Sequence, residues 1–104
     1  MCTAGGMTTY FVTRHPGARE WAETNGVQVD RVVEHFDVRA IQPGDVVIGS
    51  LPVNLAWQVC MRGGRYFHLS LEIPQEWRGK ELTKEQMDAF GATIEEYVVR
   101  RAEP

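Results

Sequence analysis

The feature that most constrains the fold is a short apolar run that ends in glycine. Residues 45–49 read Asp-Val-Val-Ile-Gly, and the turn-forming sequence Gln-Pro-Gly stands directly before them. A run this short, without polar alternation, is typical of a strand at the buried centre of a parallel sheet. Parallel strands are joined by crossover connections, so the rest of the chain should supply helices that cover the sheet.

Strand patterns alternate with helix patterns along the remaining sequence. β-branched and aromatic residues predict three further strands, at residues 8–13, 27–33 and 65–71. Proline and glycine place two helices between them, from Pro16-Gly17 to Gly26 and from Ser50-Leu51-Pro52 to Gly63-Gly64. The order of elements is therefore strand, helix, strand, strand, helix, strand.

A third helix is predicted for the C-terminal segment. Thr83 and Gln86 have the spacing of a capping box, and Leu82 and Met87 are placed as a hydrophobic staple. An apolar stripe at helical spacing extends the predicted helix over Met87, Phe90, Ile94, Tyr97 and Val98.

These elements predict a single small Rossmann-like α/β domain over residues 7–104. The sheet is expected to be mostly parallel, with about four or five strands and helices on both faces. Residues 1–6 are expected to form a disordered or non-core extension. A chain of 104 residues has room for one core but no deep cleft of its own, so a sizeable ligand site is expected to be shared between subunits.

The formal net charge of −3 excludes a protein that coats DNA or long RNA, because such binding depends on many basic side chains. Residues 1–71 carry six basic and six acidic side chains, so the whole acidic excess lies in residues 72–104. Much of it falls on the predicted last helix, which is interpreted as a solvated face. A local cationic pocket remains compatible with this balance.

The two cysteines, Cys2 and Cys60, form neither a disulfide framework nor a metal-binding spacing, and a reducing cytoplasmic location is expected. No apolar run reaches the length of a membrane span, and no metal or cofactor is expected.

Candidate site residues follow the first predicted strand. Ligands of open α/β sheets bind beyond the carboxyl ends of the strands, and Arg14 and His15 stand at such an end. An arginine can bind two phosphate oxygens, and a histidine can donate a hydrogen bond or a proton. Gly17 would let a ligand approach the free amides at the helix start. The alternative is that the Arg-His pair only caps the helix or pairs with nearby glutamates.

The turn after residues 45–49 offers a second group, Gly49, Ser50 and Asn54, while Arg78 lies in a basic loop that could close over an anion. Ser50 could equally be an N-cap, and Arg78 a solvated loop residue. His68 is interpreted as a core or interface histidine within a strand, and His35 as a solvated loop residue.

The chain also resembles a known family. The strings TTYFVTRHPGA (8–18), GDVVIGSLPVNLA (44–56), YFHLSL (66–71), RGKELT (78–83) and GA (91–92) are similar to those of small accessory proteins encoded with type III CRISPR systems. The resemblance implies a homodimeric Rossmann-like domain related to CRISPR-associated sensors of signalling nucleotides. It further implies a ring nuclease that cuts cyclic oligoadenylate, chiefly cyclic tetra-adenylate, and so ends antiviral signalling.

Under this hypothesis the ribose 2′-hydroxyl attacks the adjacent phosphorus without a metal. Arg14 and the turn amides would stabilise the phosphorane, and His15 would protonate the leaving oxygen or bind the scissile phosphate. Ser50 and Asn54 would position ribose or phosphate. The alternatives are a module of the same fold that only binds the cyclic nucleotide, and an interaction subunit without a nucleotide ligand.

Overall fold

The apolar run at residues 45–49 forms the central strand of the sheet, as predicted. In the computed structural model, which describes residues 8–102, β3 (Val46–Gly49) lies between β1 (Thr9–Val12) and β4 (Arg65–Ser70) and is parallel to both. The predicted extension at residues 1–6 lies outside the described residues.

Two edge strands complete a five-stranded sheet of order β2-β1-β3-β4-β5. β2 (Arg31–Val33) is parallel to β1, whereas β5 (Thr93–Tyr97) is antiparallel to β4. The expected strand at residues 27–33 is thus limited to its last three residues. The chain moves outward from β1 to β2 and then returns to add β3, so the strand order reverses between β1 and β3.

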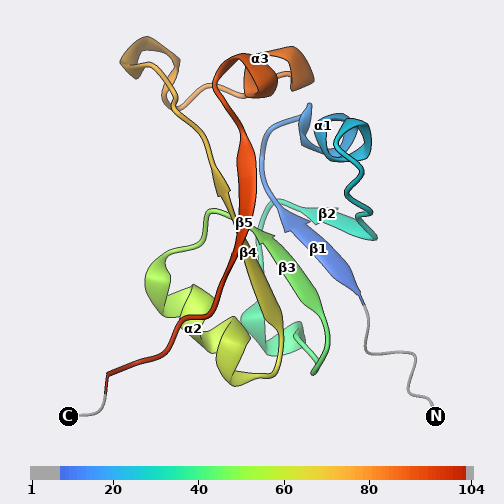
Figure 1. Ribbon diagram of the computed structural model, residues 1–104, viewed down its shortest axis with the longest axis vertical. Helices are drawn as coiled ribbons and strands as arrows, with labels where there is room; N and C mark the ends of the chain where they lie inside the picture. The colour runs from blue at the N-terminus through green and yellow to red at the C-terminus, as the bar shows by residue number, and fades with distance from the viewer. Residues whose placement is uncertain (1–7, 103–104) are drawn as a thin grey trace.

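Helices cover both faces, which confirms the predicted α/β class (Figure 1). α1 (Ala18–Thr24) and α3 (Lys84–Ala89) pack on one face, and α2 (Val53–Met61) packs on the other. Two short 3-10 helices, η2 (Val38–Ala40) and η3 (Gln75–Trp77), lie in the connections.

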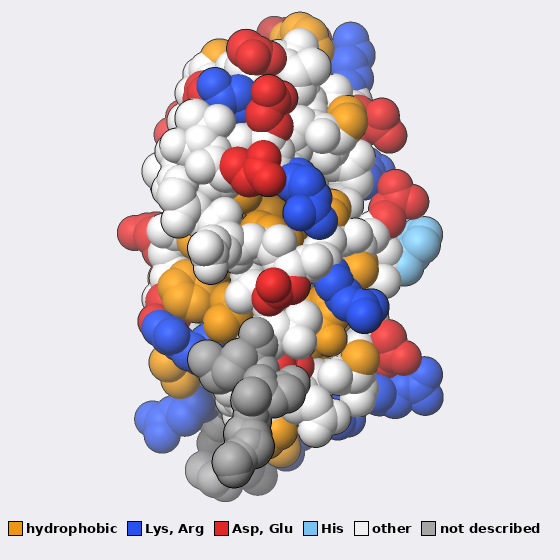
Figure 2. Space-filling model, turned by 90° about the vertical axis from the view of Figure 1, so that its right-hand side faces the viewer, with side chains coloured by type: hydrophobic (Ala, Val, Ile, Leu, Met, Phe, Trp, Pro, Cys, Tyr) orange, Lys and Arg blue, Asp and Glu red, His pale blue; other side chains and the backbone are white. Residues whose placement is uncertain are grey.

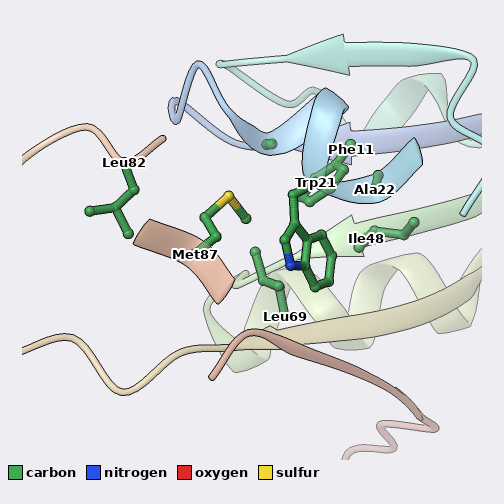
Figure 3. Close-up of a cluster of buried hydrophobic side chains, with 8 residues drawn as sticks. Phe11, Trp21, Ala22, Ile48, Leu69, Leu82 and Met87 are labelled. Carbon is green, nitrogen blue, oxygen red and sulfur yellow. The ribbon is translucent and has the colours of Figure 1, made fainter. Parts of the chain in front are cut away.

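The larger core lies between the sheet and the α1/α3 pair. Trp21 of α1, Met87 of α3 and Leu69 of β4 converge there, and all three are buried (Figure 3). The second core lies under α2, where Val47 and Tyr66 of the sheet meet Val59 of the helix. The alternation of Tyr66, His68 and Ser70 with Phe67 and Leu69 places the first three on the α2 face of β4.

The buried carboxylate of Asp45 fixes the turn that precedes β3. Its Oδ1 accepts a hydrogen bond from the Thr8 N–H at 3.0 Å, and its Oδ2 accepts one from the Gln42 N–H at 2.9 Å. The side chain therefore joins the turn to the start of β1, which sets the position of β3 in the sheet.

The predicted long last helix is wrong beyond its first turns. The capping box of Thr83 and Gln86 is present, but α3 ends at Ala89. Gly91 has a φ of 72°, its N–H donates to the Asp88 carbonyl, and the Ala92 N–H donates to the Met87 carbonyl. These bonds form a Schellman motif, which stops a helix at a glycine in the left-handed conformation.

The apolar stripe beyond Gly91 belongs instead to β5. Ile94 pairs with Leu69 in the antiparallel register and packs against the larger core. The acidic side chains of this segment accordingly lie on an edge strand rather than a helix, and Glu96 forms a two-point ion pair with Arg65 at 2.8 Å. A charged edge strand also discourages pairing with other chains through the backbone.

On the face seen in Figure 2, acidic and basic side chains are interspersed, with apolar side chains between them. Among residues 8–102, the helices are all too short or too polar to cross a bilayer.

Candidate functional site

An open cavity of about 970 Å³ lies beyond the carboxyl ends of the parallel strands. It occupies the place where the strand order reverses between β1 and β3, which is where α/β sheets bind ligands. Its polar lining comes from four strand ends and from the segment before α3, and comprises Thr13, Arg14, His15, Glu34, His35, Ser50, His68, Ser70 and Glu81.

Arg14 lies two residues beyond the end of β1 and is exposed at this cavity. Within residues 8–102, the ion pairs of the structure do not include Arg14. A guanidinium outside these ion pairs keeps its donors available to an anion.

His15 is half-buried and is held in one orientation by the backbone around it. Its backbone N–H donates to Thr13 Oγ1 at 3.1 Å, and its ring Nδ1 accepts a hydrogen bond from the backbone N–H of Leu82 at 3.1 Å. Because Nδ1 accepts, the proton of the neutral ring must be on Nε2. Burial, and secondly the charge of Arg14, lower the pKa of His15, while Glu81 acts in the opposite direction. At neutral pH His15 is therefore an uncharged donor.

Ser50 lines the cavity but does not cap α2, whose N-cap is Pro52. Its hydroxyl donates to the Leu69 carbonyl at 2.6 Å and so joins the ends of β3 and β4. Because the hydroxyl proton is used in the bond to Leu69, the Ser50 oxygen can only accept hydrogen bonds from a ligand.

The predicted site residues Gly17, Gly49, Asn54 and Arg78 do not line the cavity. Gly17 is needed for packing, because a Cβ there would lie 2.1 Å from the backbone nitrogen of Lys84. A Cβ at Gly49 would lie 2.9 Å from the Val12 carbonyl oxygen. Asn54 is exposed on the first turn of α2, and Arg78 is exposed after η3.

The expectation of free amides at the helix starts is wrong for three groups. The Gly17 N–H donates to the Leu82 carbonyl, and the Ala18 N–H donates to the His15 carbonyl. The Leu51 N–H donates to the Tyr66 hydroxyl at 3.0 Å. The Ala18 bond is a local turn, whereas Gly17 and Leu51 find acceptors because their loops contact the segment before α3 and strand β4, contacts that the local sequence does not reveal.

The sequence interpretation missed His68, which faces the cavity from the end of β4. Its Nδ1 lies 2.7 Å from the Tyr66 hydroxyl, and that hydroxyl also donates to the Gly49 carbonyl at 3.0 Å. The available signal was the alternation along β4, which puts His68 on the same face of the strand as Tyr66 and Ser70.

Two glutamates of the lining were also missed. Glu34 follows β2, where its carboxylate is 3.7 Å from the Nε2 of His35, and Glu81 precedes α3. The site is therefore of mixed charge, with one arginine, three histidines and two carboxylates. Within the part of the chain that the structure describes, three or more potential metal ligands do not gather at any point.

A comparison with protein-family models identifies the relatives of this chain. Residues 10–100 match the family described as "Putative CRISPR-associated protein (Cas_VVA1548)". The chain belongs to this family. Searches of curated proteins and of solved structures found no match. The matched residues cover all of the sheet except Thr9 and include the cavity lining, and membership in a CRISPR-associated family confirms that part of the resemblance.

Proposed function

We propose that the protein is a cytoplasmic ring nuclease that cleaves cyclic oligoadenylate, chiefly cyclic tetra-adenylate, and so switches off type III CRISPR signalling. The observation that supports this most directly is the convergence of Arg14, His15 and His68 on one open cavity at the ligand-binding edge of the sheet. The family supports the CRISPR setting, and the resemblance of the sequence suggests the substrate.

The reaction is attack of a ribose 2′-hydroxyl on the adjacent phosphorus. It expels the 5′-oxygen and leaves a 2′,3′-cyclic phosphate, with no metal required when the attacking and leaving oxygens are in line. Charge develops on the phosphorane, so a cation and a neutral donor near its oxygens lower the barrier.

Arg14 supplies the cation in this mechanism. Its exposed guanidinium can bind two phosphate oxygens at the cavity edge. His15 donates a hydrogen bond from Nε2–H to a non-bridging phosphate oxygen. We favour this role over proton transfer to the leaving oxygen, because the Leu82 N–H bonded to Nδ1 keeps the ring in its neutral Nε2–H form. The Ser50 oxygen, which lines the cavity, accepts a hydrogen bond from a ribose hydroxyl.

A homodimer would supply the remaining surface that a cyclic tetranucleotide needs. Four exposed apolar side chains, Val53, Met61, Tyr97 and Val98, form what we call the α2/β5 patch. A shallow hollow that includes Val53 and Tyr97 shares His68 and Ser70 with the site cavity, so the patch is continuous with the site. A second copy docked there would bring two cavities around one symmetric ligand.

The test is to incubate the purified protein with cyclic tetra-adenylate in EDTA and to identify the products. We expect linear products that end in a 2′,3′-cyclic phosphate. Intact ligand would overturn the proposed nuclease activity, and tight binding without products would identify a binding module instead. Absence of both binding and thermal stabilisation would favour an interaction subunit.

Arg14→Ala tests the proposed cation. We expect the single-turnover rate to fall by about 10²-fold to 10³-fold, since the substitution removes one preorganised donor from the transition state. Arg62→Ala is the matched control, because Arg62 is exposed at the end of α2 and does not line the cavity. Equal rates for both variants and the wild type would contradict the role of Arg14.

A further inference from the structure

The Tyr66 hydroxyl determines which nitrogen of His68 carries the proton. It has three polar neighbours: the Leu51 N–H at 3.0 Å, the Gly49 carbonyl at 3.0 Å and His68 Nδ1 at 2.7 Å. The hydroxyl has one proton and two lone pairs. All three contacts are hydrogen bonds only if the hydroxyl accepts from Leu51, donates to Gly49 and accepts from His68. His68 therefore carries its proton on Nδ1.

His15 has the opposite arrangement. The backbone N–H of Leu82 can only donate, so His15 Nδ1 accepts and its Nε2 carries the proton. In their neutral forms the two rings thus present different atoms to the same cavity. His15 presents an N–H donor, whereas His68 presents an unprotonated nitrogen that can accept a proton.

The ring of His68 is held in one orientation by its neighbours, so that Nδ1 and Nε2 keep separate roles. It packs edge-on against Tyr66 and Tyr97, with ring centroids 5.8 and 5.9 Å apart. Within residues 8–102 the structure shows no hydrogen-bond partner for His68 Nε2, while Nδ1 is engaged by Tyr66. The residue lines the cavity from the strand end next to Ser50.

We propose that His68 is the general base of the reaction and that Tyr66 is its positioning residue; this inference rests on the proposed function. The Nε2 atom of His68 removes the proton of the attacking 2′-hydroxyl, and the Tyr66 hydroxyl keeps the proton of the neutral ring on Nδ1. His15 and Arg14 bind the phosphate on which the attack takes place.

The step balances without a co-reactant. The 2′-oxygen forms a bond to phosphorus as its proton moves to His68 Nε2, and the bond from phosphorus to the 5′-oxygen breaks. The 5′-oxygen takes a proton from solvent, and His68 returns its proton to solvent. The net change is an isomerisation of one phosphodiester into a 2′,3′-cyclic phosphate and a 5′-hydroxyl.

The first test measures the tautomers directly, by ¹⁵N NMR of the imidazole rings in the ligand-free full chain at a pH where both rings are neutral. We expect the Nδ1–H form for His68 and the Nε2–H form for His15. In Tyr66→Phe, the His68 signals should shift toward a mixture of tautomers, while Tyr10→Phe leaves them unchanged. An Nε2–H form of His68 in the wild type would overturn the proposal, whether or not the protein cleaves its ligand.

The second test separates a base from an acid. We compare cyclic tetra-adenylate with an analogue that carries a bridging 5′-sulfur, a leaving group that needs no protonation. His68→Gln should reduce the rate on both substrates by about 10²-fold to 10⁴-fold, as expected for a lost general base. Ligand binding and the His15 tautomer should persist in this variant, which shows that it is folded.

If the His68→Gln variant cleaved the sulfur substrate at the wild-type rate, the base role would be overturned. A wild-type rate of this variant on the natural substrate would overturn it as well. In Tyr66→Phe the cleavage rate should fall by about 10-fold to 100-fold, the usual effect of removing a group that orients another. If the wild type itself releases no products, the proposed function fails, and the tautomer measurement still decides the arrangement of the two histidines.

Discussion

At the scale of single residues, the site depends on contacts that orient its histidines, one of them between distant parts of the chain. Leu82 is 67 positions from His15, yet its backbone N–H selects the tautomer of that histidine. Tyr66 acts similarly on His68, at a separation of two residues along β4. Two side chains with the same intrinsic chemistry are thereby given opposite hydrogen-bonding roles.

The lowered pKa of His15 predicts a pH effect on stability. The unfolded chain binds a proton at a higher pH than the native state does, so the free energy of unfolding falls as the pH drops below the ordinary histidine value. His15→Gln should show a smaller loss between pH 7.5 and pH 5.5 than the wild type, measured from urea midpoints. An equal loss in both proteins would contradict a native-state shift at this residue.

At the scale of elements, α1 and α3 approach so closely that Gly17 has no room for a side chain. The same contact carries the Gly17 N–H bond to Leu82 and the Leu82 bond to His15. The packing of two helices on one face of the sheet therefore also positions a site residue at its edge.

Gly17→Ala should destabilise the fold by about 3 kcal/mol or more, because the new methyl group would overlap the backbone at Thr83 and Lys84. Gly26→Ala is the control: its φ of 76° is strained for alanine, but open space surrounds the site, and we expect a loss of about 1 kcal/mol. Urea denaturation of both variants measures the difference. Similar losses of stability in the two variants would contradict a requirement for glycine at position 17 imposed by the close approach of α1 and α3.

At the scale of the whole molecule, the apolar surface is distributed unevenly. Of the large hydrophobic residues that are exposed among residues 8–102, Val53, Met61, Tyr97 and Val98 belong to the α2/β5 patch, and Val32 lies on the opposite edge strand. A patch next to the site is where a second copy would complete the binding surface.

Met61→Lys should weaken the proposed dimer by at least about 10-fold, since it places a charge in the apolar contact. Met61 is 66% exposed in the single chain, so the substitution should leave the fold intact. Sedimentation equilibrium measures the dissociation, with Val32→Lys as the control on the far edge of the sheet. A monomeric wild type, or equal dimer stability in both variants, would contradict this placement.

Much of the sheet and its first two helices could be predicted from local patterns. The residues of β1, β3 and β4 and the turns into α1 and α2 have short-range signatures, namely β-branched runs, proline at helix starts and glycine at turns. These signatures do not depend on the rest of the fold, because they act through the backbone preferences of neighbouring residues. The location of Arg14, His15 and Ser50 at one edge follows from the parallel order of their strands.

Gly91 is a local stop signal for α3, but the strand that follows it and the roles within the cavity were decided by tertiary structure. Ile94 and Tyr97 suit either a helix or a strand, and pairing with the free edge of β4 determined the outcome. The sequence likewise placed His68 in a strand, but its role as an acceptor requires the Tyr66 hydroxyl, the Gly49 carbonyl and the Leu51 amide to meet. Hydrogen bonds between separate elements exist only once the chain has folded, and local sequence patterns carry no record of them.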